Sequence, residues 1–63
     1  MPFKIREARK ERGFTQEELA KRAHVSRATI IGLENGSITV TTTETLTKIA
    51  NALGKKVSDI FLA

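Results

Sequence analysis

The chain has 63 residues, no cysteine, one histidine and a formal net charge of +4 at pH 7. This length predicts a single domain, 1–63, with one small core, while the lack of cysteine excludes disulfides and thiolate metal sites; a lone histidine cannot hold a metal by itself, and we expect no cofactor. The positive balance favours a polyanion such as nucleic acid, although a soluble domain with a cationic surface has the same charge.

The apolar residues recur at helical spacing along the whole chain. The first predicted helix lies within 3–13, where apolar residues stand among charged ones and a glycine ends the pattern. A second helix is predicted over 15–23. Thr15 and Glu18 have the spacing of a capping box, in which the hydroxyl and the carboxylate each accept a hydrogen bond from the other residue's backbone N–H.

A short break separates the second helix from a third, which is predicted over 27–35. Ser26 is suited to cap the start of this helix and Gly36 to end it. Two helices joined by a turn of three or four residues are typical of the helix-turn-helix motif. Ala20 is the small residue that a tight crossing of the two helices needs. The residues expected to hold the pair together are Leu19, Ala23, Val25, Ile30 and Leu33.

The second half of the chain predicts two further helices. Residues 37–43, "SITVTTT", indicate a loop, with an isolated strand as the alternative. A fourth helix is predicted over 43–53 and a final short one within 55–63. The candidate caps are Thr41 or Thr42 for the fourth helix and Ser58 for the fifth. Five short helices with short connections predict an all-α compact bundle.

The stretch "TQEELAKRAHVSRATIIGLENG" resembles the Cro and phage-repressor (XRE-like) family of helix-turn-helix DNA-binding domains. The flanking stretches "REARKERGFTQEELA" and "ETLTKIANALG" fit the same family, so the resemblance covers nearly the whole chain. It implies a lambda-repressor-like fold whose third helix enters the DNA major groove. It also implies a sequence-specific regulator of transcription that binds double-stranded DNA. We expect a small stand-alone bacterial or phage repressor, acting as a homodimer on a pseudo-palindromic operator.

The resemblance implies base-reading positions in the third helix at Arg27, Ala28, Thr29 and Gly32. Arg27 is the strong polar reader, because arginine can donate two hydrogen bonds to guanine; a phosphate contact or a solvated charge is the alternative. Ala28 can touch a thymine methyl group, and Thr29 can donate to a base or a phosphate. Gly32 has no side chain to read with, so we expect it to permit a close approach instead.

Gln16 and Ser26 match family positions that contact DNA phosphates at helix N-termini, where unpaired N–H groups attract anions. The alternative is that each side chain only caps its helix. Asn35 and Ser37, at the end of the third helix, are weaker candidates for phosphate contact.

Arg9 and Glu34 match a pair that forms an internal salt bridge in related domains, and this pair would tie the first helix to the third. His24 stands in the turn where the family usually has glycine. That position often needs φ above zero, which costs histidine some stability. The loop 37–43 also departs from the family, because it contains no basic residue.

Phe61 and Leu62, near the C-terminal end, are candidate dimer contacts, because an exposed apolar end on a small domain is typical of an interface. The alternative is that Phe61 closes the core.

A protein-binding module is the alternative function. Some small relatives act as antitoxins with secondary DNA binding, so an unidentified protein partner is the alternative to DNA binding alone.

An enzyme is rejected, because the chain has one aspartate and one histidine and lacks a glycine-rich phosphate loop. No apolar run approaches the roughly 18 residues of a membrane span, and the first residues lack the apolar segment of a signal peptide. We therefore expect a cytoplasmic protein with no membrane partner.

Overall fold

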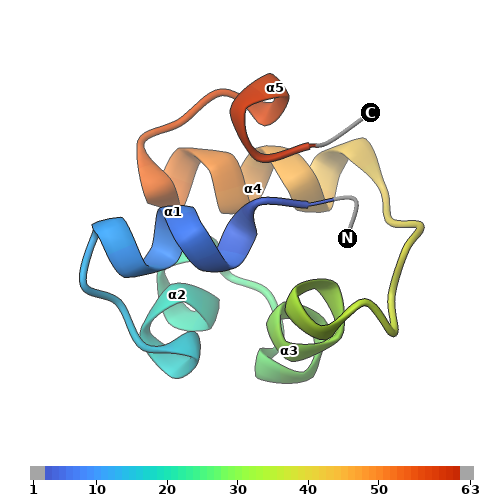
Figure 1. Ribbon diagram of the computed structural model, residues 1–63, viewed down its shortest axis with the longest axis horizontal. Coiled ribbons are helices and arrows are strands. Elements are labelled where there is room, and N and C mark those ends of the chain that lie inside the picture. Colours follow the sequence, from blue (N-terminus) through green and yellow to red (C-terminus); the bar gives the residue numbers. More distant parts are fainter. Residues whose placement is uncertain (1–2, 62–63) are drawn as a thin grey trace.

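The computed structural model describes residues 3–61 and has five helices within them: α1 (Ile5–Glu11), α2 (Gln16–Ala23), α3 (Arg27–Asn35), α4 (Thr43–Leu53) and α5 (Val57–Ile60). Figure 1 shows α4 crossing the middle of the molecule, with α5 on one side of it and α2 and α3 on the other. α4 packs against both α2 and α5, and α2 packs against α3. The predicted all-α bundle is confirmed, and the predicted loop 37–43 contains no strand, with its last residue starting α4.

Hydroxyl side chains cap the starts of three helices. The side-chain oxygens of Thr15, Ser26 and Thr42 each accept a hydrogen bond from the backbone N–H three residues later, at 3.0, 3.1 and 3.1 Å. Only the hydroxyl half of the predicted capping box of α2 is present. The Glu18 carboxylate lies 3.7 Å from Arg22. These local bonds explain why the predicted starts of α2, α3 and α4 agree with the structure.

The predicted cap of α5 is wrong. The helix begins at Val57, one residue before Ser58, and the Asp59 carboxylate accepts a hydrogen bond from the backbone N–H of Lys56 at 3.0 Å. A carboxylate inside the first turn therefore fixes the start of α5, and Ser58 lies within the helix.

The chain segments before α1 and after α5 lie side by side. Phe3 and Phe61 form an isolated antiparallel β-bridge, and the backbone N–H of Lys4 donates to the carbonyl of Ile60 at 2.7 Å. The two phenyl rings are 5.6 Å apart between centroids. This pairing joins residues far apart in sequence and closes one edge of the core.

The core collects the apolar faces of all five helices. Its buried members are Phe3, Ile5, Ala8, Leu19, Ala20, Ala23, Ile30, Leu33, Leu46, Ile49, Ala50, Leu53 and Ile60. The residues predicted to hold α2 and α3 together are all in this core except Val25, which is partly buried against it. No helix in the described part of the chain is long and apolar enough to cross a membrane.

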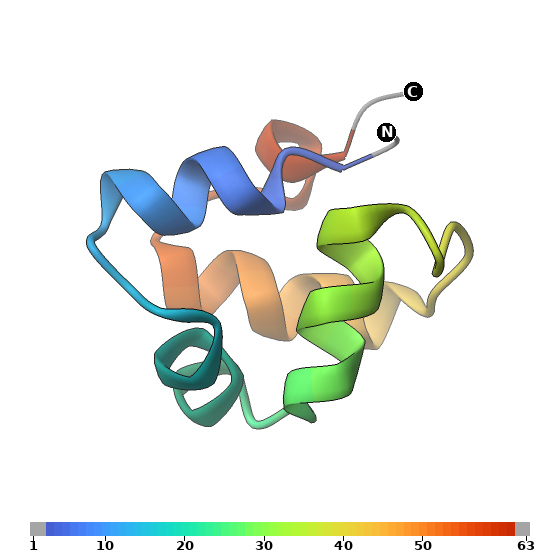
Figure 2. The ribbon, with the colours of Figure 1, turned by 60° about the horizontal axis from the view of Figure 1, so that its bottom comes forward.

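The turn between α2 and α3 passes through a left-handed backbone conformation. His24 has φ 57° and ψ 41°, so the predicted positive φ is confirmed. The backbone N–H of Val25 then donates to the carbonyl of Ala20 at 3.1 Å, which closes the end of α2. The turn directs α3 away from α2, as Figure 2 shows, and leaves the start of α3 at the surface.

Candidate nucleic-acid interface

The N-terminal end of α3 presents side chains to solvent. Figures 1 and 2 show α2 and α3 together on the side of the molecule away from α5. Arg27 and Ala28 are exposed and Thr29 is half-buried, while Ile30 and Leu33 of the same helix are buried. Three of the four predicted base-reading residues therefore share the start of α3, where backbone N–H groups have no partner within the helix.

The first turn of α3 differs in charge from those of the other long helices. The first turns of α1, α2 and α4 each contain an acidic residue, whereas that of α3 contains none. Arg27 instead places a cation at the positive end of the helix dipole, at a cost of about 0.3–1 kcal/mol. None of the ion pairs found between residues 3 and 61 involves Arg27. The start of α3 is therefore a positive surface suited to an anionic ligand.

Ser26 and Thr29 form a pair of hydroxyls at this same end. Their oxygens are 2.7 Å apart, and Ser26 also accepts the backbone N–H of Thr29. The bond between the hydroxyls uses one of their two hydrogens, so one hydrogen is left to donate outward. Ser26 thus caps α3, as one of its two predicted roles required, and the pair keeps a donor for a phosphate or a base.

Gly32 does not lie on the exposed surface of α3. It is buried, and a Cβ atom built on it would be 2.5 Å from Cδ1 of Ile38 and 2.6 Å from its Cγ1. The absent side chain therefore makes room for a residue of the following loop. This corrects the placement of Gly32 among the base-reading positions: the close approach that it permits is internal.

Glu34, near the C-terminal end of α3, is the centre of a buried polar cluster. Arg9 donates from Nε to Oε2 at 2.7 Å and from Nη2 to Oε1 at 3.1 Å, so the expected salt bridge from α1 to α3 is present. Arg6 and Gln16 donate to Oε1 at 3.5 and 3.2 Å. Glu34 is 1% exposed, and no buried side-chain nitrogen or oxygen among the described residues lacks a hydrogen-bond partner.

The surroundings of Glu34 lower its pKa. Burial by itself raises the pKa of this carboxyl group, because it disfavours the charged form. The hydrogen bonds from Arg9, Gln16 and Arg6 and the charge of Arg9 together exceed that effect. The carboxylate is therefore ionised in the folded protein at neutral pH and holds α1, α2 and α3 in a fixed arrangement.

Arg6 and Gln16 are partners of Glu34 that the sequence interpretation missed. Arg6 lies one helical turn before Arg9, so both guanidinium groups can reach the same side of α1. That spacing was the available signal. The side-chain amide of Gln16 has two N–H donors. One donates to Glu34, and the second can donate to a phosphate. Gln16 is the first residue of α2, and its side chain joins that helix to the Glu34 cluster.

Asn35 and Ser37 lie exposed at the far end of α3. The side-chain oxygen of Asn35 accepts the backbone N–H of Ser37 at 2.8 Å, so this side chain stabilises the turn after the helix. Phe61 is 43% exposed, and its ring packs on buried Phe3. Leu62 lies outside the described residues.

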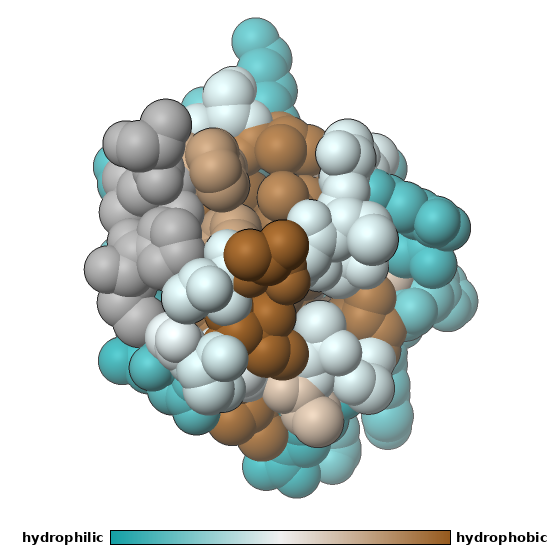
Figure 3. All heavy atoms as spheres, turned by 90° about the vertical axis from the view of Figure 1, so that its right-hand side faces the viewer, coloured by the Kyte–Doolittle hydropathy of each residue, from teal (hydrophilic) through white to brown (hydrophobic). Residues whose placement is uncertain are grey.

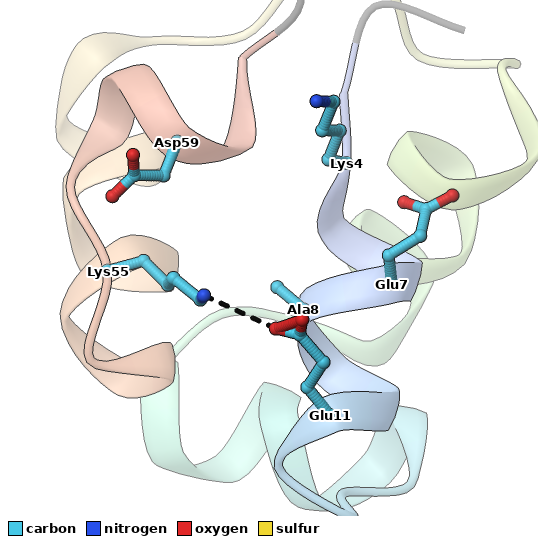
Figure 4. A pocket seen from close by; sticks show the side chains of 6 residues that line it. All are labelled: Lys4, Glu7, Ala8, Glu11, Lys55 and Asp59. Carbon is cyan, nitrogen blue, oxygen red and sulfur yellow. Dashed lines mark ion pairs between the residues drawn. The ribbon is translucent and has the colours of Figure 1, made fainter.

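A pocket of about 310 Å³ lies on another part of the surface, between α1 and α5. Figure 4 shows Glu11 reaching across it to Lys55, with 3.2 Å between Oε1 and Nζ. The lining residues are Lys4, Glu7, Ala8, Glu11, Lys55 and Asp59. Three carboxylates face two ammonium groups here, so this pocket does not suit a polyanion, and the start of α3 is the better candidate.

Comparisons with known proteins agree with the all-α helix-turn-helix fold described above. The helix-turn-helix family model matches residues 5–60. An uncharacterized HTH-type transcriptional regulator of Methanothermobacter thermautotrophicus is 51% identical over 59 residues, which cover 92% of this chain and 84% of that protein. Another, from Archaeoglobus fulgidus, is 40% identical over 62 residues, covering 98% and 87%. Both relatives are archaeal, so they lend no support to the expected bacterial or phage origin.

Among solved structures, the chain is similar to SinR, the master regulator for biofilm formation, in complex with DNA. The TM-score is 0.83, the sequences are 30% identical, and the match covers 86% of each chain. The family model and the relatives span the motif, the core and the Arg9–Glu34 pair alike. The chain therefore belongs to the helix-turn-helix family, of the Cro and phage-repressor type.

Proposed function

We propose that the chain binds a specific operator in double-stranded DNA through the start of α3 and represses transcription there as a homodimer. The chain is a DNA-binding transcriptional regulator. The observation that supports sequence-specific binding is the surface at the start of α3. There an exposed Arg27 without an ion-pair partner among residues 3–61 stands beside the Ser26–Thr29 hydroxyl pair.

The residues at this surface have separate tasks in the proposal. Arg27 donates two hydrogen bonds to a guanine in the major groove, which is worth about 1–3 kcal/mol of discrimination. Ala28 contacts a thymine methyl group, and Thr29 donates to a base edge or a phosphate. Ser26 and the free N–H of Gln16 hold phosphates and so fix the register of α3 in the groove.

Asn35 and Ser37 contribute weaker phosphate contacts beyond the end of α3. The amide group of Asn35 has two N–H donors that its bond to Ser37 does not use, because that bond engages the side-chain oxygen.

A homodimer explains how so small a surface can select a site. One domain presents a single strong polar reader, so it distinguishes few base pairs. Two copies related by a twofold axis read two half-sites about 34 Å apart, and a pseudo-palindromic operator follows from that symmetry. The protein acts where its DNA is, in the cytoplasm, and repression results if the operator overlaps a promoter.

The test is selection of operators from randomised duplexes with the purified protein at physiological salt. The wild type is compared with Arg27→Ala and with Lys56→Ala, which removes one cation from the start of α5 on the opposite side of the molecule. We expect the wild type and Lys56→Ala to enrich the same spaced inverted repeat, and Arg27→Ala to lose a guanine preference in each half. If no sequence is enriched and binding fades uniformly with salt, the proposal of a specific regulator fails.

A further inference from the structure

The connection between α3 and α4 is an uncharged part of the surface. Residues 35–43 form the longest run without a charged residue in the chain. Val40 in this run is 86% exposed, more than any other large hydrophobic residue between 3 and 61. Figure 3 looks onto this side and shows hydrophobic atoms at its centre, framed by residues of intermediate hydropathy. We call residues 38–42 the uncharged loop.

One of the two apolar side chains of this loop packs against the core, and the other does not. Ile38 is partly buried against the core and lies over Gly32, and its backbone N–H donates to the Gly32 carbonyl at 3.0 Å. This contact fixes the loop on α3. Val40 lies two residues further on and is almost fully exposed, so the fold itself does not explain a β-branched apolar residue there.

The charge of the molecule favours a second copy as the occupant. Two copies of a chain with net charge +4 repel each other, and the repulsion is smallest where neither surface carries a charge. The uncharged loop meets that condition against itself, since threonine hydroxyls can both donate and accept hydrogen bonds across a twofold axis. DNA is a poorer occupant, because the loop has no cation to place on a phosphate.

The size of this side sets the strength to expect. The molecule measures 24 × 22 × 19 Å between Cα atoms, and Figure 3 looks along its longest axis, so the side shown there is a small face of 22 × 19 Å between Cα atoms. Stable complexes bury about 800 Å² per partner, which is about a fifth of the 3907 Å² surface of this chain. The pair should therefore be weak in free solution.

We propose that a second copy of the chain docks on the uncharged loop, with Val40 at the centre of the contact. This inference rests on the homodimer of the proposed function and names its surface. The loop follows closely on Gly36, which ends α3. Two copies that meet there hold their α3 helices in a fixed relation, so that DNA with matching half-sites strengthens a contact that is weak alone.

The experiment is sedimentation equilibrium of the wild type, Val40→Lys and Asn51→Lys, without DNA, from about 10 µM to about 1 mM. Asn51→Lys adds the same charge at an exposed position near the C-terminal end of α4, whereas Val40 precedes the start of that helix. We expect reversible dimers of the wild type and Asn51→Lys, and a dissociation constant at least about tenfold higher for Val40→Lys. A wild type that stays monomeric, or a Val40→Lys variant that pairs as well as the wild type, would overturn the proposal.

A second measurement distinguishes a dimer surface from a phosphate contact. Binding of the three proteins to a short duplex of mixed sequence is followed across salt concentrations. A Val40→Lys variant that dimerises normally but binds DNA more tightly, with a salt dependence steeper by about one phosphate, would contradict the proposal and place the loop on DNA. Because the sedimentation experiment contains no DNA, it decides the dimer surface even if specific operator binding fails.

Discussion

Arg9 of α1 donates to Glu34 of α3 over 2.7 Å, and this bond joins the first helix to the helix whose start is the candidate nucleic-acid interface. The same guanidinium donates from Nη1 to the carbonyl of Phe14 at 2.7 Å, just before α2. One side chain therefore connects three consecutive parts of the fold. The orientation of α3 depends on a polar contact as well as on the apolar core.

Removing Arg9 should destabilise the fold strongly. Arg9→Ala leaves the buried Glu34 carboxylate with only Arg6 and Gln16, so we expect a loss of about 3 kcal/mol, the low end for a broken buried pair. Arg9→Lys keeps the charge without the two-pronged geometry and should lose less. Urea unfolding measures both, with Lys10→Ala as an exposed control on the same helix. Equal stability of Arg9→Ala and Lys10→Ala would show that the pair contributes little.

Acid should destabilise the protein partly through Glu34. The pKa of this carboxyl group lies below its ordinary value of 4.5 in the folded state, so the unfolded chain takes up the proton first as the pH falls. The stabilisation linked to Glu34 is therefore complete above about pH 4.5 and is lost progressively below it, through the folded pKa. Urea midpoints of the wild type and Glu34→Gln, measured from neutral to acid pH, should converge below pH 4.5. Parallel curves would mean that Glu34 titrates normally.

His24→Gly should stabilise the protein. His24 has φ 57°, a conformation that costs an L-residue about 1–2 kcal/mol and costs glycine nothing. We expect a net gain of about 1 kcal/mol after the greater entropy of unfolded glycine, which raises the melting temperature by about 4–8 °C. His24→Ala is the matched control, since it changes the side chain but keeps the strain. If both variants melt together, the histidine side chain and not the backbone decides the stability.

Gly32 and Ile38 should be coupled in stability. Alanine at position 32 favours the helix by about 1 kcal/mol, but in the wild type its Cβ meets Ile38 at 2.5 Å and must displace it. Gly32→Ala should therefore stabilise the Ile38→Ala background and not the wild type, with a coupling of about 1 kcal/mol or more. Unfolding of the four proteins gives the coupling directly. Additive effects would mean that the loop moves aside freely.

The sequence predicts the parts of this fold that depend on near neighbours. The caps Thr15, Ser26 and Thr42 bond to backbone groups three residues away, so their pattern is visible in the sequence. The start of α5 was missed because Asp59 fixes it from within the first turn, through the backbone N–H of Lys56, whereas the sequence interpretation sought a hydroxyl cap before the helix. The pairing of Phe3 with Phe61 joins the two ends of the chain, and no local pattern indicates it.

The residues of the candidate site also differ in how well the sequence predicts them. Arg27 and Ala28 are exposed because the turn before α3 fixes which residues begin the helix. The burial of Gly32 depends on how a loop folds back over α3, and the bonds of Arg6 and Gln16 to Glu34 depend on how three helices converge. These are packing outcomes, which a pattern of residue types along one helix does not determine.

The most direct test of the central claim compares the wild type and Arg27→Ala on two duplexes. One duplex is the selected operator, and the other has the guanine assigned to Arg27 replaced by adenine. We predict that the base change weakens the wild type by about 1–3 kcal/mol and leaves the affinity of Arg27→Ala nearly unchanged. If the base change weakens both proteins equally, Arg27 does not read that base, and its role at the start of α3 is limited to a phosphate contact.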